Sequence, residues 1–194
     1  MGIITQKWVK LLFPFSSNYH GKFSETELAK ITNTPQQSAS RYLKDLINQG
    51  IVTYDTQGRN KLLYLDFSKL STLPLMHTIE SQKALEFSQK AQEATVIINE
   101  ILTFCETIIL FGSYATYKFD KQSDLDIVIM GKTDKNKIKS VKQKYPLQIN
   151  EHYITSTEFA KTLKAKNPLA TEITKNHILF GKISEIIRIM INTR

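Results

Sequence analysis

The alternation of apolar and polar positions predicts a helical start to the chain. Apolar residues at helical spacing from Ile4 to Leu12 indicate a first amphipathic helix, which Pro14 is expected to stop. Ser24 and Glu27 have the spacing of a capping box and predict the start of a second helix. We therefore expect two short helices at the beginning of the chain.

A third helix and a hairpin follow. The helix is expected to begin at Pro35, where the missing N–H costs nothing, and to end at Gly50. Two strand-like runs, Ile51–Tyr54 and Lys61–Leu65, flank a segment rich in turn-forming residues and predict a β-hairpin. Helix, turn, helix and hairpin together resemble the winged helix-turn-helix domains of prokaryotic regulators, over residues 1–66.

The third helix and the hairpin tip expose polar and basic side chains. In a DNA-binding winged helix, side chains of the recognition helix contact base edges and those of the wing contact phosphates. The alternative is a small domain that only contacts proteins, with these charges in water. The residues expected to bind DNA are Gln36, Gln37, Ser40, Arg41, Lys44, Arg59 and Lys61.

The segment after Pro74 predicts one long helix. No glycine or proline interrupts Leu75–Phe111, and apolar residues repeat at helical spacing from Ala84 to Ile101. We expect this helix to fill most of a linker that spans residues 67–104. Its apolar stripe needs a partner, which is either the sheet that follows or a second copy of the chain in a homodimer.

Strand and helix patterns alternate through residues 105–194, which we expect to form one domain. Short β-branched runs at Ile108–Phe111 and Ile127–Met130 predict two buried strands, and Leu147–Ile154 predicts a third. Helical patterns separate and follow these strands. The predicted fold class is therefore α+β, with an α/β-type sheet and flanking helices, preceded by a small winged-helix domain.

Two aspartates and a Gly-Ser pair lie at the ends of the first two of these strands. Asp124 and Asp126 project to the same side, and their mutual repulsion favours a cation between them. Mg²⁺ is the expected ion, with Mn²⁺ as the alternative. Gly112 lets a phosphate approach the backbone, and Ser113 offers it a hydroxyl donor. These residues predict a site for a triphosphate and metal ions.

The same residues resemble the signature of the DNA-polymerase-beta-like nucleotidyltransferase superfamily. The segments Gly112–Ala115 and Ser123–Asp126 are most similar to its minimal nucleotidyltransferase branch. The resemblance implies that Gly112 and Ser113 bind the β and γ phosphates of ATP or another nucleoside triphosphate. It also implies that Asp124 and Asp126 are catalytic residues that hold the metal ions.

Two positions depart from the superfamily pattern. Most active members carry a third carboxylate on the next strand, where the residues expected to face the site are Gln148, Asn150 and His152. Glu151 is the nearest acid but needs a bulge or a register shift to reach the site, and His152 is the candidate base in its place. The usual arginine after the Gly-Ser turn is also missing, and Lys118 is its candidate substitute.

The composition shows that the chain is basic, and the absence of apolar spans in the sequence bears on its expected cellular location. The chain of 194 residues has a formal net charge of +8, and half of it lies in residues 1–64, which hold eight Lys/Arg against four Asp/Glu. This favours a polyanionic partner for the N-terminal part. No apolar run has the length of a membrane span, no signal-peptide pattern occurs, and Cys105 is the single cysteine. A cytoplasmic protein without a membrane partner is expected.

Lysines concentrate again at residues 131–145. This segment holds six lysines and one aspartate, and Ile138 and Val141 are its large aliphatic residues. It predicts a short exposed helix. Such a helix is either a solvated face or a contact for nucleic acid or an acidic partner.

These features lead to one functional hypothesis and two alternatives. We expect an enzyme that transfers a nucleoside monophosphate from a nucleoside triphosphate with Mg²⁺ to an acceptor hydroxyl on a partner protein, releases pyrophosphate, and binds DNA through its winged helix. The first alternative is a catalytically degenerate DNA-binding regulator or antitoxin that uses the domain as a nucleotide sensor or partner-binding module. In the minimal branch the implied partner is a small helical HEPN-type protein. The second alternative, modification of a small molecule such as an aminoglycoside, needs an acceptor site for which the chain after Ile108 is short.

Overall fold

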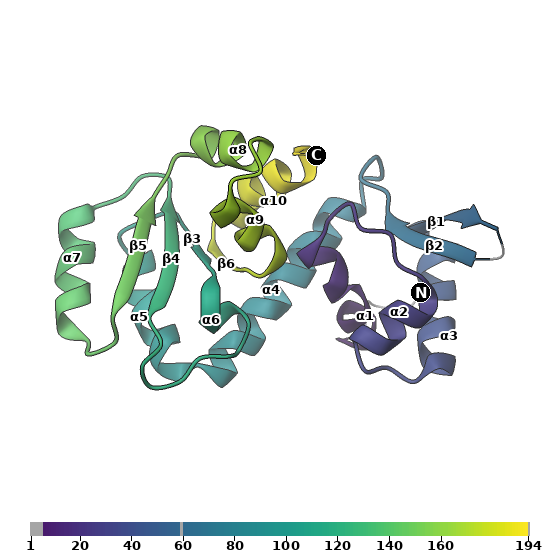
Figure 1. Cartoon of the computed structure of the whole chain (residues 1–194), viewed down its shortest axis with the longest axis horizontal. Coiled ribbons are helices and arrows are strands. Elements are labelled where there is room, and N and C mark those ends of the chain that lie inside the picture. The colour runs from purple at the N-terminus through teal and green to yellow at the C-terminus, as the bar shows by residue number, and fades with distance from the viewer. Residues whose placement is uncertain (1–5, 59, 194) are drawn as a thin grey trace. The chain divides into compact units, whose positions relative to one another are not determined.

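The computed structural model describes residues 6–58 and 60–193, which form two compact units (Figure 1). The division falls within a helix, between Ile79 and Glu80. Ile4 and Arg59, both named in the sequence predictions, lie outside the described residues. None of the helices in the described ranges is long and apolar enough to cross a membrane. Helices and strands occur in both units, so the predicted α+β class is confirmed.

The N-terminal unit is a winged helix. Three helices precede an antiparallel hairpin, and an isolated antiparallel bridge joins Phe23 to Leu63 of the hairpin. The capping box predicted at Ser24 opens the second helix. Its elements are α1 (Gln6–Ser17), α2 (Glu25–Ile31), α3 (Gln36–Asn48), β1 (Val52–Gln57) and β2 (Asn60–Leu65).

α1 continues through Pro14, where the sequence predicts its end. A proline inside a helix loses one backbone hydrogen bond and costs about 3 kcal/mol. Leu11, Leu12 and Phe15 surround it and are fully buried, and burial of each such side chain stabilises the fold by about 1.5–3 kcal/mol. The packing of α1 therefore outweighs the local cost of the proline.

The hairpin is longer than the sequence predicts. Its register runs from Val52 opposite Leu65 to Gln57 opposite Asn60. The turn is therefore short, and Gly58 adopts a φ of +61°, which favours glycine. Cross-strand pairing extends β1 into residues whose local preference is for a turn.

The predicted long helix is two helices. α4 (Thr72–Lys90) and α5 (Gln92–Leu102) are separated at Ala91, whose φ of −128° and ψ of 64° are not helical. No glycine or proline marks this break in the sequence. Phe87, Ala91 and Ala94 are all buried in the cluster that covers the following sheet. We attribute the break to this packing. The apolar stripe thus packs against the sheet that follows, which is one of the two partners predicted for it.

The C-terminal unit is built on a mixed sheet with the strand order β5-β4-β3-β6. β3 is antiparallel to both of its neighbours, whereas β4 and β5 are parallel. As the first strand in this order, β5 forms one edge of the sheet. The remaining elements are β3 (Thr107–Leu110), α6 (Gly112–Ala115), β4 (Leu125–Met130), α7 (Lys135–Lys144), β5 (Ile149–Tyr153), α8 (Ser156–Lys164), α9 (Pro168–Lys175), β6 (Ile178–Gly181) and α10 (Ile183–Asn192).

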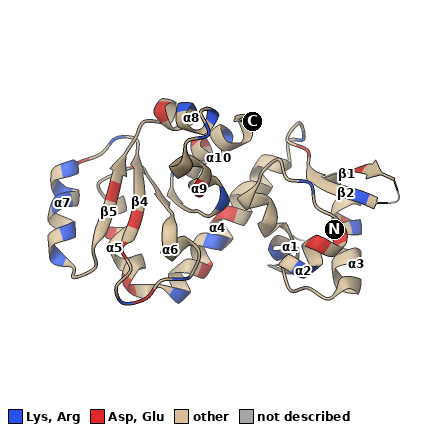
Figure 2. Ribbon diagram, viewed as in Figure 1, with Lys and Arg blue, Asp and Glu red and all other residues tan. Residues whose placement is uncertain are grey.

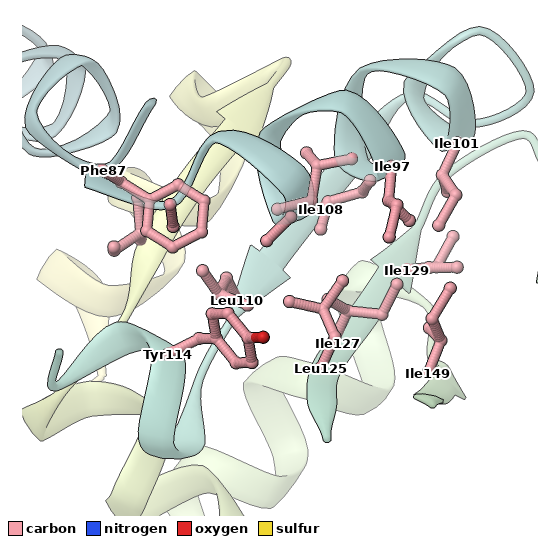
Figure 3. Packing of buried hydrophobic residues seen from close by; sticks show 14 of the residues in the cluster. Phe87, Ile97, Ile101, Ile108, Leu110, Tyr114, Leu125, Ile127, Ile129 and Ile149 are labelled. Carbon is pink, nitrogen blue, oxygen red and sulfur yellow. The ribbon is translucent and has the colours of Figure 1, made fainter. Parts of the chain in front are cut away.

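One face of this sheet forms the core that positions the site. Alternate strand residues such as Ile108, Ile127 and Ile149 face the apolar side of α5, which includes Ile97 and Ile101 (Figure 3). These side chains are buried. Because strand side chains alternate, the residues between them project to the opposite face of the sheet. Burial of the alternate apolar side chains therefore fixes the direction in which the intervening side chains project.

A buried charged cluster joins α4 to the end of α9. The Glu80 carboxylate is fully buried, pairs with Lys83 at 3.0 Å and lies 3.2 Å from His177 Nε2. His177 Nδ1 lies 2.7 Å from the carbonyl oxygen of Ile173. Burial alone would raise the pKa of Glu80, but the charges and hydrogen bonds of Lys83 and His177 outweigh it and lower the pKa to about 2.

Candidate functional site

A tight turn joins β3 to α6 and brings Gly112 against Asp126. Gly112 has a φ of +70°, and a Cβ on it would lie 2.5 Å from Asp126 Oδ2. The N–H of Phe111 donates to the Asp126 carbonyl at 3.0 Å and fixes the approach. Glycine is therefore required here for two reasons, backbone conformation and space.

The two aspartates lie together at the start of β4. Leu125 and Ile127 are buried in the core, and this burial directs Asp124 and Asp126 to the opposite face. Both carboxylates are half-buried. Asn150 is opposite Asp126 in the parallel β4–β5 register. The sequence predicts this face for Asn150 but assigns it no role.

Asn150 bridges the two carboxylates. Its Nδ2 donates to Asp124 Oδ2 at 3.1 Å and to Asp126 Oδ1 at 3.0 Å. Two carboxylates this close repel each other, and the amide hydrogens reduce the repulsion. The orientation of an Asn amide follows from its hydrogen-bond partners, so a cation between the aspartates would favour Oδ1 in place of Nδ2. The Asn150 side chain therefore fits the site both without a cation, when Nδ2 faces the aspartates, and with a cation, when Oδ1 does.

The oxygen-rich cluster fits a divalent cation that also binds phosphate. Mg²⁺ is commonly held by one or two carboxylates together with phosphate oxygens of the substrate. The described residues contain no group of three or more His, Cys, Asp or Glu side chains that would hold a metal ion without such help. Asp124 and Asp126 would supply two carboxylates to such an ion, and phosphate oxygens beside Gly112 would complete its coordination.

Ser113 and Lys118 border the same turn. Ser113 is the second residue of α6, and its carbonyl accepts the N–H of Lys118 at 3.0 Å. The side chain of Lys118 is exposed. The backbone bond keeps Lys118 close to the Gly-Ser turn, and the described contacts do not connect its ammonium group to either aspartate.

The structure does not bring Glu151 to the aspartates. Glu151 is opposite Ile127 in the register, and its carboxylate pairs with Lys142 of α7. It therefore projects to the face opposite Asn150, because neither a bulge nor a register shift interrupts the β4–β5 ladder. The position expected for a third carboxylate is occupied by Asn150. The bulge or register shift that Glu151 would need to reach the aspartates is absent from this ladder.

His152 lies on the same face as Asn150 but is exposed and further along the strand. Its ring is 6.1 Å from the ring of Phe111, the residue before Gly112. Among the described contacts none joins the imidazole to an aspartate. His152 thus borders the site without touching the carboxylates.

The residues predicted to bind DNA lie on an exposed face, as far as they are described. Arg41 of α3 lies over the ring of Tyr42 at 5.1 Å, and Gln36 donates to Glu25 at 3.1 Å. On the wing, Lys61 lies over Tyr54 at 4.3 Å. Gln36, Gln37, Ser40, Arg41, Lys44 and Lys61 are all exposed, and Arg59 is outside the described residues.

Two aspartates at the start of β4, beside a glycine turn that ends the neighbouring strand, are the arrangement that the sequence predicts for a nucleotidyltransferase site. Residues 97–185 match the family model for polymerase beta nucleotidyltransferases. The match covers less than half of the chain and supports, for this part, the DNA-polymerase-beta-like nucleotidyltransferase superfamily that the motif predicts.

Comparisons with whole proteins add little to this assignment. The search of curated proteins found no match. Among solved structures, the chain resembles MepR, a transcription regulator of the Staphylococcus aureus multidrug efflux pump MepA. The TM-score is 0.36 and the identity 17%, over 52% of this chain and 76% of MepR. This likeness is too weak to carry an argument, so the winged-helix description rests on the elements and bridge given above.

Proposed function

We propose that the protein transfers a nucleoside monophosphate from a nucleoside triphosphate to a hydroxyl group on a partner protein. The observation that carries the proposal is the cluster at the Gly112 turn, where two carboxylates bridged by Asn150 lie beside the backbone of a Gly-Ser pair. In the proposed reaction the acceptor oxygen bonds to the α-phosphorus while the bond from that phosphorus to the β-phosphate oxygen breaks. Pyrophosphate leaves, and the hydroxyl proton passes to water.

Each residue of the site has a separate task in this proposal. Gly112 leaves room for the β and γ phosphates, and Ser113 donates a hydrogen bond to them. Asp124 and Asp126 hold Mg²⁺, or Mn²⁺, which would neutralise charge on the attacking and leaving oxygens. Asn150 rotates its amide to offer Oδ1 when a cation is present. Lys118 and His152 border the site and are second candidates for phosphate binding and proton transfer.

A second candidate function is a DNA-binding regulator that senses the nucleotide without transferring it. The observation in its favour is Asn150 at the position of the third carboxylate, because an amide is not a base for the acceptor hydroxyl. Such a regulator would need the same nucleotide and metal contacts. The two candidates therefore differ in turnover and agree on binding.

Label transfer separates the two. The chain would be incubated with Mg²⁺ and ATP labelled at the α-phosphate, alone and in a lysate, with GTP, CTP and UTP in parallel reactions. Label on a discrete protein supports the transferase. Metal-dependent nucleotide binding without any labelled product would contradict it and support the sensor.

Replacing Asn150 by aspartate is expected to make the domain more dependent on metal. Without a cation, the variant loses two N–H···O bonds and gains a third negative charge, which lowers the free energy of unfolding by about 1–3 kcal/mol. Added Mg²⁺ should then raise the melting temperature of Asn150→Asp more than that of the wild type. The exposed Asn99→Asp provides the control. Equal responses of all three proteins to Mg²⁺ would contradict the assignment.

The winged helix is proposed to bind DNA through α3 and the wing. Arg41 and Lys44 are exposed on one face of α3, opposite the buried Ala39 and Leu43. Reversal of one such charge is expected to weaken binding of duplex DNA about tenfold, because the DNA phosphates repel the introduced glutamate. The salt dependence of DNA binding should also fall, because the variant neutralises fewer phosphates. Fluorescence anisotropy with a random-sequence duplex would compare Arg41→Glu with Lys30→Glu on α2. Equal affinities of the two variants would contradict this DNA-binding face.

A further inference from the structure

A basic groove runs between α7 and the free edge of the sheet. Its volume is about 710 Å³, and β5 and α7 provide its two walls. Lys135, Lys139 and Lys142 line the helical wall, and Asn150 and Glu151 are among the residues of the strand wall. In the ribbon of Figure 2 the basic residues, coloured blue, recur along α7 beside β5. We call this feature the α7–β5 groove.

The strand wall presents backbone groups that are not paired with another strand. Gln148 accepts the N–H of Leu125 at 2.8 Å, and Ile154 donates to Ile129 at 3.2 Å, so the even-numbered residues of this strand turn their backbone groups toward β4. By alternation, the N–H and C=O groups of Ile149, Glu151 and Tyr153 face the groove. In the described ranges, β4 is the strand that pairs with β5.

The helical wall presents lysines at a matching repeat. Lys135 and Lys139 are one helical turn apart, about 6 Å along the axis, and same-face side chains of an extended peptide repeat at about 6.8 Å. Lys142 is paired with Glu151, and Lys135 lies over the ring of Tyr153 at 4.5 Å. Lys139 is exposed and has no ion-pair partner within the described residues. The groove therefore combines strand pairing on one wall with positive charge on the other.

We propose that the α7–β5 groove binds an acidic, extended segment of a partner protein, which adds to the edge of β5 as a further strand. Side chains on one face of that segment would meet the lysines of α7, and the alternate ones would project on the face of Asn150 and Asp126. A hydroxyl on that second face would point toward the nucleotide site. This inference describes how the groove holds the acceptor protein, so it rests on the proposed transfer reaction.

Peptide fits the groove better than nucleic acid does. The outward backbone groups of β5 complement those of another strand, whereas a sugar-phosphate chain offers no N–H donors in that pattern. The lining of the groove contains no arginine, the side chain whose planar group pairs best with phosphate. An acidic peptide can displace Glu151 from Lys142 while it gains backbone hydrogen bonds.

Anisotropy with labelled peptides tests the proposal on the full chain. The probe is a peptide of about seven residues with glutamate at alternate positions, long enough to cover the five residues of β5. We expect saturable binding that weakens about tenfold in Lys139→Glu and by about twofold or less in the exposed control Lys164→Glu. The same peptide N-methylated on the pairing backbone nitrogens should lose binding with its charge unchanged. Equal binding by Lys139→Glu, equal binding of the N-methylated peptide, or tighter binding of an oligonucleotide of equal charge would overturn the proposal.

The site variant Asp124→Asn/Asp126→Asn separates this inference from the proposed function. It should bind the acidic peptide as the wild type does, because its substitutions lie outside the lining of the groove. Peptide binding that depends on Lys139, with no label transfer by the wild type, would overturn the transfer reaction and leave the groove assignment standing. Label transfer to the partner at an unchanged rate by Lys139→Glu would overturn the groove and leave the reaction standing.

Discussion

Asp126→Asn is expected to lower nucleotide transfer about a thousandfold while the fold is kept. Loss of a metal-binding carboxylate removes several kcal/mol of transition-state stabilisation, and each 1.36 kcal/mol corresponds to about tenfold in rate. The asparagine retains an oxygen that accepts a hydrogen bond from Asn150, and the change relieves repulsion with Asp124. The melting temperature should therefore stay equal or rise. Initial rates of label transfer and thermal unfolding would be measured on the same preparation.

Asp120→Asn is the matched control for this experiment. Asp120 lies in the loop before β4 and accepts hydrogen bonds from the N–H of Gln122 and the hydroxyl of Ser123, which an asparagine oxygen also accepts. Its carboxylate has no contact with Asn150 in the described structure. Equal rates for wild type and Asp126→Asn, or an equal loss in Asp120→Asn, would remove Asp126 from the proposed mechanism.

Glu80→Gln is expected to lower the free energy of unfolding by roughly 3–5 kcal/mol, the usual cost of removing one partner from a buried ion pair. Glutamine keeps the shape of the side chain but leaves Lys83 and His177 without the buried negative charge. Chemical denaturation at neutral pH measures the change. The exposed Glu172→Gln should stay within about 0.5 kcal/mol of the wild type. A similarly small change in Glu80→Gln would contradict the role of the cluster.

The pH dependence of stability gives a second readout for Glu80. The pKa of Glu80 is about 2 in the folded protein, below the ordinary value of 4.5. Its contribution to stability is therefore complete above about pH 4.5 and is lost as the pH falls from there toward 2. Part of the acid destabilisation of the wild type should be absent in Glu80→Gln.

The sequence predicts the parts of the site that depend on local pattern. Burial of Leu125 and Ile127 follows from their apolar side chains, and the alternation of a strand then places Asp124 and Asp126 on one face. The glycine turn and its spacing from the aspartates led to the superfamily, which the family model confirms. The placement of Asn150 on the site face follows from the same alternation.

Other features depend on contacts between distant residues. Pro14 and Ala91 show this for the helices, because packing keeps one helix intact through a proline and interrupts another that has no breaking residue. The bridge that Asn150 makes requires the β4–β5 register, which sequence spacing leaves open. The buried contact between Glu80 and His177 likewise joins residues far apart in the sequence, and no spacing rule predicts it. The HEPN-type partner, the homodimer and the antitoxin role stay predictions.

The proposed function requires that the cluster of Gly112, Asp124 and Asp126 binds a nucleoside triphosphate together with a divalent metal ion. Isothermal titration of ATP into the wild type and into Asp124→Asn/Asp126→Asn, each with Mg²⁺ and with EDTA, tests it most directly. We expect the wild type to bind ATP with Mg²⁺ and to lose binding in EDTA, and the double variant to show no difference between the two conditions. Binding that is the same in both proteins, or independent of Mg²⁺ in the wild type, would contradict the account.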